Sequence, residues 1–245
     1  MRALQTFTLA LLICAASSAA SPERASAQAE SLDTRYQTWA AAFLHGPITG
    51  DLWLWTDLHA RFYDVFEPAA MLVRPGLSWR VLDNLWLTLG YAWTPSWRRT
   101  DEPRQWGDLE FTDEHRIWQQ VVYQPSDPGT RISGQVRVRL EERFRHQPDF
   151  DVGFRVRIFL RGQVVLDPEG WVVFALWDEV FVPISDSAWG QRAGFDQNRL
   201  FVGFGFNVIP GSVRVDVGYT NQWIPREGTD SVNHIAAVNT FIGWR

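Results

Sequence analysis

The sequence contains no lysine, so all 23 of its basic side chains are arginine, and it has one cysteine. The single thiol, at Cys14, excludes a disulfide framework and any metal site built from several cysteines. The formal charge of −5 argues against a nucleic-acid partner, because such proteins are usually basic. Beyond the N-terminal region no stretch reaches the roughly 18 consecutive apolar residues of a transmembrane helix, and helical periodicity is absent.

The chain has 245 residues, of which 46% are hydrophobic and 14% aromatic, a composition that excludes a disordered or collagen-like protein. Residues 1–27 have the features of a signal peptide: Arg2, an apolar core over 7–16, and a small-residue cleavage site at Ala25-Ser26-Ala27. The apolar core is too short for a retained membrane anchor. We therefore expect a signal peptide at 1–27 and one domain at 28–245.

Alternation with period two runs through the remaining sequence and predicts β-strands. In the segment 131–144 one parity is polar and the other apolar, except at Glu142, and the segment 151–164 repeats this arrangement. A weaker candidate covers 37–44. The other predicted strands are 51–63, 70–81, 85–94, 114–124, 171–182, 197–208, 212–222 and 233–244.

The connections between these segments alternate in length. Short turns are expected at 82–84, 125–129, 167–170 and 209–212, and longer connections at 95–113, 183–196 and 223–232. This alternation is typical of outer-membrane barrels, and a sheet in hydrocarbon must close so that every backbone polar group has a partner. We predict an all-β fold, an antiparallel transmembrane β-barrel of about 10–12 strands. An even count, ten or twelve, is expected if both termini are periplasmic, and 37–44 then lies outside the barrel or pairs with a further strand.

The apolar parity, rich in valine, leucine and tryptophan, is expected to face lipid in the bacterial outer membrane, with lipid and lipopolysaccharide as its partners. Asp178, Gln119 and Pro75 do not fit this parity or its strands. The alternative is a soluble β-sandwich or a lipocalin-like periplasmic binder, whose apolar face would be buried. Aromatic residues of the apolar parity that lie near strand ends fit interfacial girdles: Trp79, Tyr91, Trp93, Tyr123, Phe144, Tyr219 and Trp244.

The polar parity predicts a charged lumen that carries an excess of arginine. Its principal members are Asp57, His59, Arg61, Glu114, Arg116, Arg137, Arg139, Glu141, Arg155, Arg157, Glu179, Arg199, Arg214 and Asp216. The same parity contains Arg74, Arg80, Arg131, Arg143, Asp151 and Arg161. Two interpretations stay open: a narrow, porin-like passage that prefers anions, or arginine–carboxylate pairs that fill the lumen of a structural barrel.

The sequence offers no catalytic constellation. None of the five histidines stands in an H-x-S arrangement, and neither a metal-ligand spacing nor a phosphate-binding loop is present, so no catalytic residue, metal or cofactor is predicted. Asp57 and His59 could form an acid–base pair, and Glu114 and Glu179 a carboxylate pair, which keeps a lipid- or lipopolysaccharide-modifying enzyme as an alternative. The acidic segment 101–114 could bind cations, but a solvated loop is the simpler interpretation.

Several short motifs, in this order and spacing, resemble one uncharacterised bacterial family, domain of unknown function 2490. They are Glu114-His115-Arg116, Arg139-Leu140-Glu141-Glu142-Arg143-Phe144, Arg155-Val156-Arg157, Asp178-Glu179-Val180-Phe181, Asp196-Gln197-Asn198-Arg199-Leu200 and Gly218-Tyr219-Thr220-Asn221-Gln222. The resemblance covers about 35–245 and implies an outer-membrane β-barrel without implying a reaction. The chain departs from the pattern in lacking lysine and in ending on Arg245 rather than on an aromatic residue.

Overall fold

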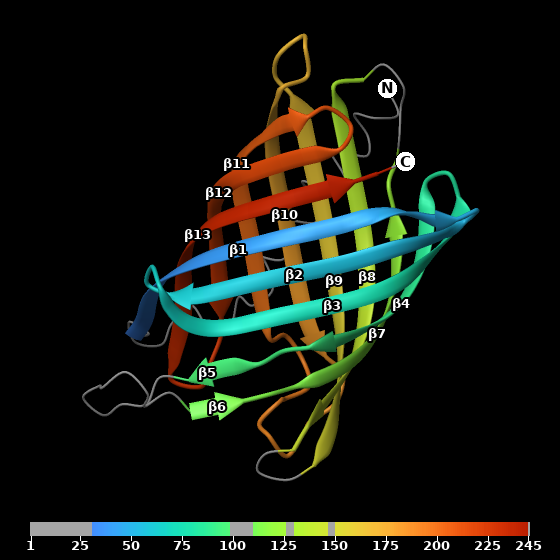
Figure 1. The fold of residues 1–245 in the computed structure, drawn as a ribbon. Helices are drawn as coiled ribbons and strands as arrows, with labels where there is room; N and C mark the ends of the chain where they lie inside the picture. Colours follow the sequence, from blue (N-terminus) through green and yellow to red (C-terminus); the bar gives the residue numbers. More distant parts are fainter. Residues whose placement is uncertain (1–30, 99–109, 126–129, 147–149, 245) are drawn as a thin grey trace.

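The computed structural model describes residues 31–98, 110–125, 130–146 and 150–244, and every regular element in these ranges is a β-strand (Figure 1). Within them no helix is long and apolar enough to cross a membrane. The strands are β1 (Ser31–Thr49), β2 (Leu52–Tyr63), β3 (Glu67–Leu82), β4 (Leu85–Trp93), β5 (Ser96–Arg98), β6 (Glu110–Thr112), β7 (His115–Tyr123), β8 (Ile132–Arg145), β9 (Asp151–Val165), β10 (Val172–Pro183), β11 (Gln197–Ile209), β12 (Val213–Ile224) and β13 (Thr229–Gly243).

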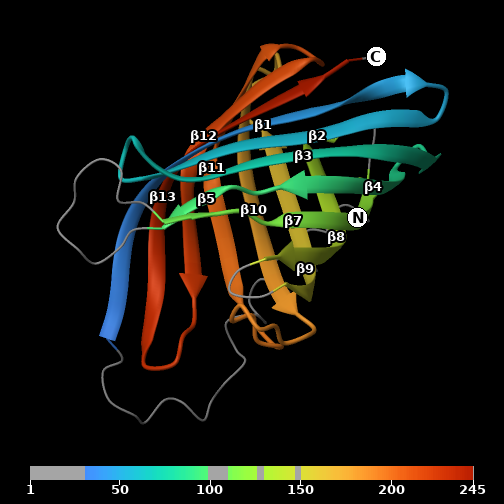
Figure 2. The ribbon, with the colours of Figure 1, turned by 60° about the horizontal axis from the view of Figure 1, so that its bottom comes forward.

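Eleven strands form a closed barrel, and β5 and β6 form a small hairpin that pairs with β3 at Ala70 and Ser96. Figure 2, in which the lower end of Figure 1 comes forward, shows the strands arranged around a common interior. All neighbours around the ring are antiparallel except β1 and β13, which pair in parallel. The predicted even count is therefore wrong. Segment 37–44 belongs to the barrel as part of β1, and parallel closure between the first and last strands gives an odd number.

The parallel seam between β1 and β13 carries aromatic contacts. Phe43 and Phe241 are opposite each other in the register and stack with ring centroids 4.9 Å apart. Trp244 donates a hydrogen bond from Nε1 to Pro47 O at 3.0 Å, and its ring occupies the space in which a side chain at Gly46 would lie. The aromatic residue that precedes Arg245 thus holds the end of the last strand against the first.

The connections lie at the two ends of the barrel, and the predicted alternation of short and long connections holds only in part, because 64–66 and 225–228 at one end are shorter than 124–131 and 166–171 at the other. We call one end the turn end, where the connections are 50–51, 83–84, 124–131, 166–171 and 210–212. The other is the loop end, where they are 64–66, 94–114, 146–150, 184–196 and 225–228. The two longest connections both lie at the loop end, but the predicted long connection at 223–232 is wrong, because β12 and β13 extend into it and leave only 225–228.

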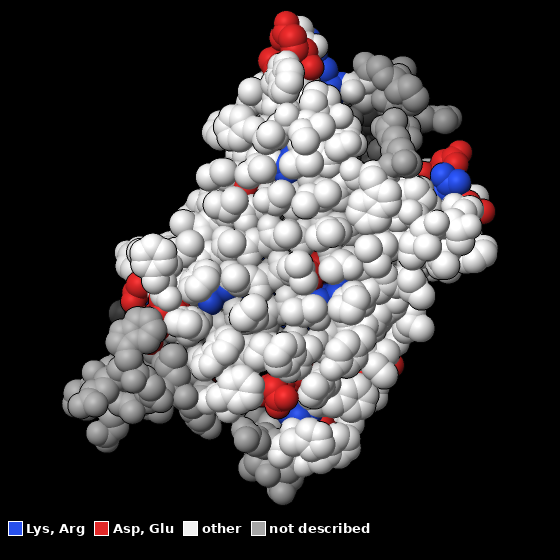
Figure 3. Space-filling view, in the orientation of Figure 1, with Lys and Arg blue, Asp and Glu red and all other residues white. Residues whose placement is uncertain are grey.

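The outer face of the barrel is apolar and the inner face is charged. Leu89, Leu77 and Phe204 are 59%, 53% and 49% exposed, whereas Arg139 and Glu141 have no exposed surface. The side of the barrel seen in Figure 3 is mostly free of charged atoms, which gather mainly toward its ends. Of the expected girdle residues all but Phe144 are among the exposed large apolar side chains, and Phe144 is half-buried.

The expectation that tryptophans face outward is only partly right. Alongside the exposed tryptophans, the inner face carries four that are buried: Trp39, Trp55, Trp86 and Trp118. Trp118 fits inside because Gly76 and Gly90, opposite each other on β3 and β4, have no side chain where its ring lies.

Asp178 and Gln119, the polar residues that did not fit the apolar parity, each form a hydrogen bond with a polar residue of a neighbouring strand. Asp178 accepts a hydrogen bond from Asn198 Nδ2 at 2.6 Å across β10 and β11, and Gln119 Nε2 donates to Glu142 Oε1 at 3.3 Å across β7 and β8. A cross-strand hydrogen bond lowers the cost of a polar group on an apolar surface. Pro75 lies within β3 on the exposed side.

Candidate functional site: an arginine-rich interior

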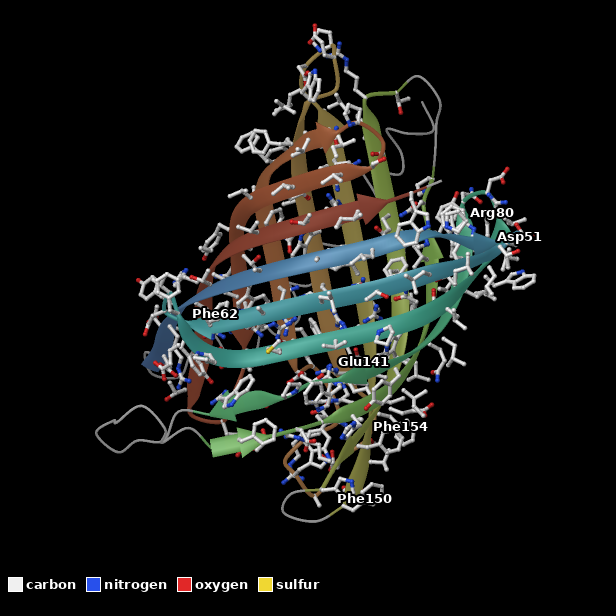
Figure 4. The ribbon with its side chains drawn as sticks, viewed as in Figure 1. Asp51, Phe62, Arg80, Glu141, Phe150 and Phe154 are labelled. Atoms are coloured by element: carbon white, nitrogen blue, oxygen red, sulfur yellow. The ribbon has the colours of Figure 1, made fainter. Side chains whose placement is uncertain are left out.

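The fourteen principal charged residues of the polar parity all lie on inward-facing positions of the barrel. Together with Arg74, Arg143 and Arg161, these residues comprise eleven arginines and five carboxylates, an excess of six positive charges. Three other expected members lie elsewhere. Arg80 pairs with Asp51 at the turn end (Figure 4), and Arg131 is exposed there. Asp151, at the loop end, accepts hydrogen bonds from the backbone of the 184–196 connection and of Val152.

Two carboxylates on β8 and β10 organise the centre of the interior. Glu141 accepts from Arg155 Nη2 and from Arg157 Nη1, both at 2.6 Å. Arg157 also donates to Glu179 at 2.7 Å, and Glu179 in turn accepts from Arg137 at 2.7 Å. Glu141 and Arg157 therefore belong to one continuous chain of ion pairs that crosses three neighbouring strands. Figure 4 shows Asp51 and Arg80 together at one end of β2 and β3, away from Glu141.

The network continues toward the loop end through Glu114, which precedes β7. Arg143 donates to both oxygens of Glu114, from Nε at 2.7 Å and from Nη2 at 2.9 Å, the bidentate geometry that matches guanidinium to carboxylate. Arg116 lies 2.5 Å from Glu114 and 3.7 Å from Glu141, so it connects the two carboxylates. Arg145 lies 3.4 Å from Glu114. Residues 101–109 of the expected solvated acidic loop lie outside the described residues, but Glu114 itself is buried.

A second group of ion pairs lies on the opposite wall, around Asp57 of β2. Its carboxylate lies 3.1 Å from Arg74 and 3.4 Å from Arg139, and it accepts a hydrogen bond from Trp55 Nε1 at 2.8 Å. Arg139 also donates to Gln120 Oε1 at 2.7 Å. Since Asp57 and Arg139 come from strands far apart in the sequence, this contact ties β2 to β8 across the lumen.

A third group lies nearer the turn end. Asp216 of β12 lies 2.6 Å from Arg161 and 2.9 Å from Arg214. Arg214 also donates to Gln163 at 2.7 Å. One carboxylate thus serves two arginines here, as in the rest of the interior.

The connection 184–196 packs into the loop end of the interior. Gln191 is buried, accepts a hydrogen bond from Arg143 at 2.8 Å, and donates to the backbone oxygens of Phe154 and Ser185. The Arg143 guanidinium also lies over the Trp189 ring, 4.6 Å from its centroid. Gly153 has no side chain in the space that the Gln191 and Trp189 side chains occupy. This connection therefore packs into the barrel rather than standing away from it.

Buried aromatic rings form part of the same inner face, a feature that the sequence interpretation missed. Guanidinium groups lie over them: Arg139 is 4.2 Å from the Trp118 ring centroid and Arg61 is 4.0 Å from that of Trp39. The parity could have revealed them, because Trp118 follows Arg116 by two residues just as Trp55 precedes Asp57 by two. Ring faces stabilise guanidinium groups that lack water.

Asp57 and His59, which the sequence left open as an acid–base pair, have other partners in the structure. His59 Nε2 lies 2.5 Å from Arg74 Nη2, and since a guanidinium can only donate, this nitrogen acts as an acceptor. Asp57 is engaged by Arg74 and Arg139 instead. Glu114 and Glu179 sit in different parts of the ion network with Glu141 between them. Within the described ranges no group of three or more His, Cys, Asp or Glu side chains is placed to hold a metal ion.

A cavity of about 570 Å³ occupies the interior next to the turn end. Exposed turn residues line its mouth, among them Asp83, Gly211 and Ser212, and it extends inward as far as Arg199 and Glu179. The residues of the ion network nearest the loop end, Glu114, Glu141 and Gln191 among others, do not line it. We call it the blind cavity, because among the described residues its lining reaches the turn end, and the ion network lies between it and the loop end.

Fold and site together define a closed β-barrel with an apolar outer face and an interior that holds arginine–carboxylate pairs beside a cavity. A family model described as Protein of unknown function (DUF2490) matches residues 36–233, and the chain belongs to this family. An uncharacterised protein of Methylorubrum extorquens is 31% identical over 213 residues, which cover 85% of this chain and 87% of that protein. No solved structure matches the chain.

Proposed function

We propose that this protein is an integral outer-membrane barrel that crosses the bilayer with its strands and does not conduct ions in its resting state. One observation carries the proposal: large apolar side chains cover the outside while paired charges fill the inside. A soluble protein of this size would bury the apolar face, because contiguous exposed apolar surface is costly in water. The N-terminal segment 1–27, with its signal-peptide features, supports export.

The same proposal orients the barrel. Outer-membrane barrels have short periplasmic turns and longer extracellular loops. On that rule the turn end faces the periplasm and the loop end faces the outside. The blind cavity then opens to the periplasm, and the ion network with the 184–196 connection closes the outer side.

Membrane insertion is tested by placing a charge at two depths on one strand. Val202 lies near the middle of β11 and Val208 one residue before its end, and both side chains are exposed and do not line the cavity. Val202→Arg is expected to destabilise the barrel in lipid vesicles by about 2–4 kcal/mol and Val208→Arg by about 0–1 kcal/mol. Equal effects of the two substitutions, or a wild-type chain that fractionates with the periplasm without detergent, would contradict insertion and favour the soluble binder.

Closure is tested by planar-bilayer recording on the full mature chain. Because the described part of the loop end is filled by ion pairs, we expect no steady current. The excess of interior arginine favours one second candidate, a narrow passage for anions. A steady anion-selective current would establish that candidate and overturn closure.

A further inference from the structure

The blind cavity is lined by seven arginines: Arg61, Arg74, Arg137, Arg157, Arg161, Arg199 and Arg214. Five of them have a carboxylate partner within 4 Å in Asp57, Glu141, Glu179 or Asp216. Arg61 and Arg199 have no such ion pair within the described part of the chain. Two guanidinium groups that line the cavity are thus left without a direct carboxylate partner among the described residues.

The two arginines lie on the same aromatic ring. Arg61 of β2 is 4.0 Å and Arg199 of β11 is 5.0 Å from the centroid of Trp39, which comes from β1. Arg199 uses Nε and Nη2 to donate to Gln197 Oε1, and the buried Arg61 Nε has no hydrogen-bond partner. The carboxylate opposite Arg199 in the register, Glu179, already accepts from Arg137 and Arg157.

An uncompensated buried charge is costly unless water or a counter-ion reaches it. A cavity that opens at the turn end gives a counter-ion access. Its walls combine polar side chains with aromatic rings, among them Phe43, Trp55, Phe159, Trp177 and Phe241. The volume of about 570 Å³ falls in the range of sites for small molecules, and far exceeds the needs of a single inorganic ion.

We propose that this cavity binds an amphiphilic anion, with a phosphate or carboxylate group between Arg61 and Arg199 and an apolar body against the aromatic walls. The ligand enters from the turn end. Binding does not require a membrane, so this proposal and the proposed membrane location can fail separately.

The probes are phenyl phosphate, inorganic phosphate and benzyl alcohol, titrated calorimetrically into the full mature chain refolded in detergent. Phenyl phosphate carries both the charge and the ring, and each other probe carries one of them. We expect phenyl phosphate to bind at least about 10-fold more tightly than either, because ring burial and the charged hydrogen bonds add to the affinity. Equal affinity for inorganic phosphate would overturn the amphiphile, and equal affinity for benzyl alcohol would overturn the anion site.

Arg61→Gln and Arg199→Gln are each expected to weaken phenyl phosphate binding by about 10-fold or more. Arg80→Gln is the matched control, since Arg80 is an exposed arginine that pairs with Asp51 outside the cavity, and its binding should equal that of the wild type. The two variants lie on different strands and report independently should one fail to fold. Unchanged affinity in a folded Arg61→Gln or Arg199→Gln variant would refute the site.

Discussion

Neutralising Glu141 tests whether the ion network supports the barrel. Glu141 has no exposed surface and binds Arg155 and Arg157 at 2.6 Å, with Arg116 3.7 Å away. Glu141→Gln keeps the size of the side chain and removes its charge. Three guanidinium groups then lose one shared partner, and the interior excess rises from six positive charges to seven.

The expected cost follows from burial. Removing one partner of a buried ion pair destabilises a protein by about 3–5 kcal/mol, because the remaining charge stays desolvated. The exposed pair of Asp51 and Arg80 offers a matched control at a similar distance, 2.9 Å, with side chains 51% and 37% exposed. Exposed pairs contribute about 0–1 kcal/mol, so Asp51→Asn should change stability little.

Equilibrium unfolding in urea, followed by tryptophan fluorescence of the refolded chain, measures both variants against the wild type. We expect Glu141→Gln to lose at least about 2 kcal/mol more than Asp51→Asn, the gap left between buried and exposed pairs. If the two variants lose the same free energy, water reaches Glu141, and the interior is not sealed as the contacts indicate.

Two further predictions concern packing and pH. Gly76→Val should destabilise the protein by about 1–3 kcal/mol in the same unfolding assay, because a Cβ there would lie 2.7 Å from the Trp118 ring. Gly243→Ala is the control and should cost less, because its Cβ would meet only His45 O at 3.5 Å. A larger loss in Gly243→Ala than in Gly76→Val would contradict the packing of Trp118. The exposed Asp167 accepts backbone hydrogen bonds from Val172 and Trp171, which hold its pKa below the usual value. A lowered pKa in the folded state gives stabilisation that is present above about pH 4 and is lost as the pH falls further, so unfolding free energies measured from pH 7 to pH 3 should decline less in Asp167→Asn; parallel declines would refute this contribution.

The sequence was informative about strands and faces because both follow from period two. Once a strand is recognised, alternation assigns Arg137, Arg139 and Glu141 to one face without knowledge of any partner. The strand prediction was weakest for β1, because the consecutive alanines Ala40, Ala41 and Ala42 interrupt the alternation of polar and apolar residues. Family resemblance pointed to the same class of protein, and the matching family model covers the residues that carry the motifs.

The pairing inside the barrel could not be derived in this way. Asp57 meets Arg139, 82 positions later in the chain, because closure of the sheet brings β2 and β8 to face each other across the lumen. Alternation fixes which side of its strand a residue occupies, but the partner depends on the register and tilt of every strand between them. For the same reason the excess of arginine could be predicted, whereas the two arginines that lack an ion pair, Arg61 and Arg199, could not.

The expectation of an even strand count failed for a related physical reason. Counting in hairpins assumes that every neighbour around the ring is antiparallel, but β1 and β13 are far apart in the sequence and no turn constrains their direction. A parallel ladder satisfies the backbone groups of both edges as an antiparallel one would. Side-chain packing stabilises this seam: Phe43 stacks on Phe241, and the Trp244 ring lies over Gly46. The parallel direction of β1 and β13 therefore depends on residues that the alternation of polar and apolar positions does not distinguish.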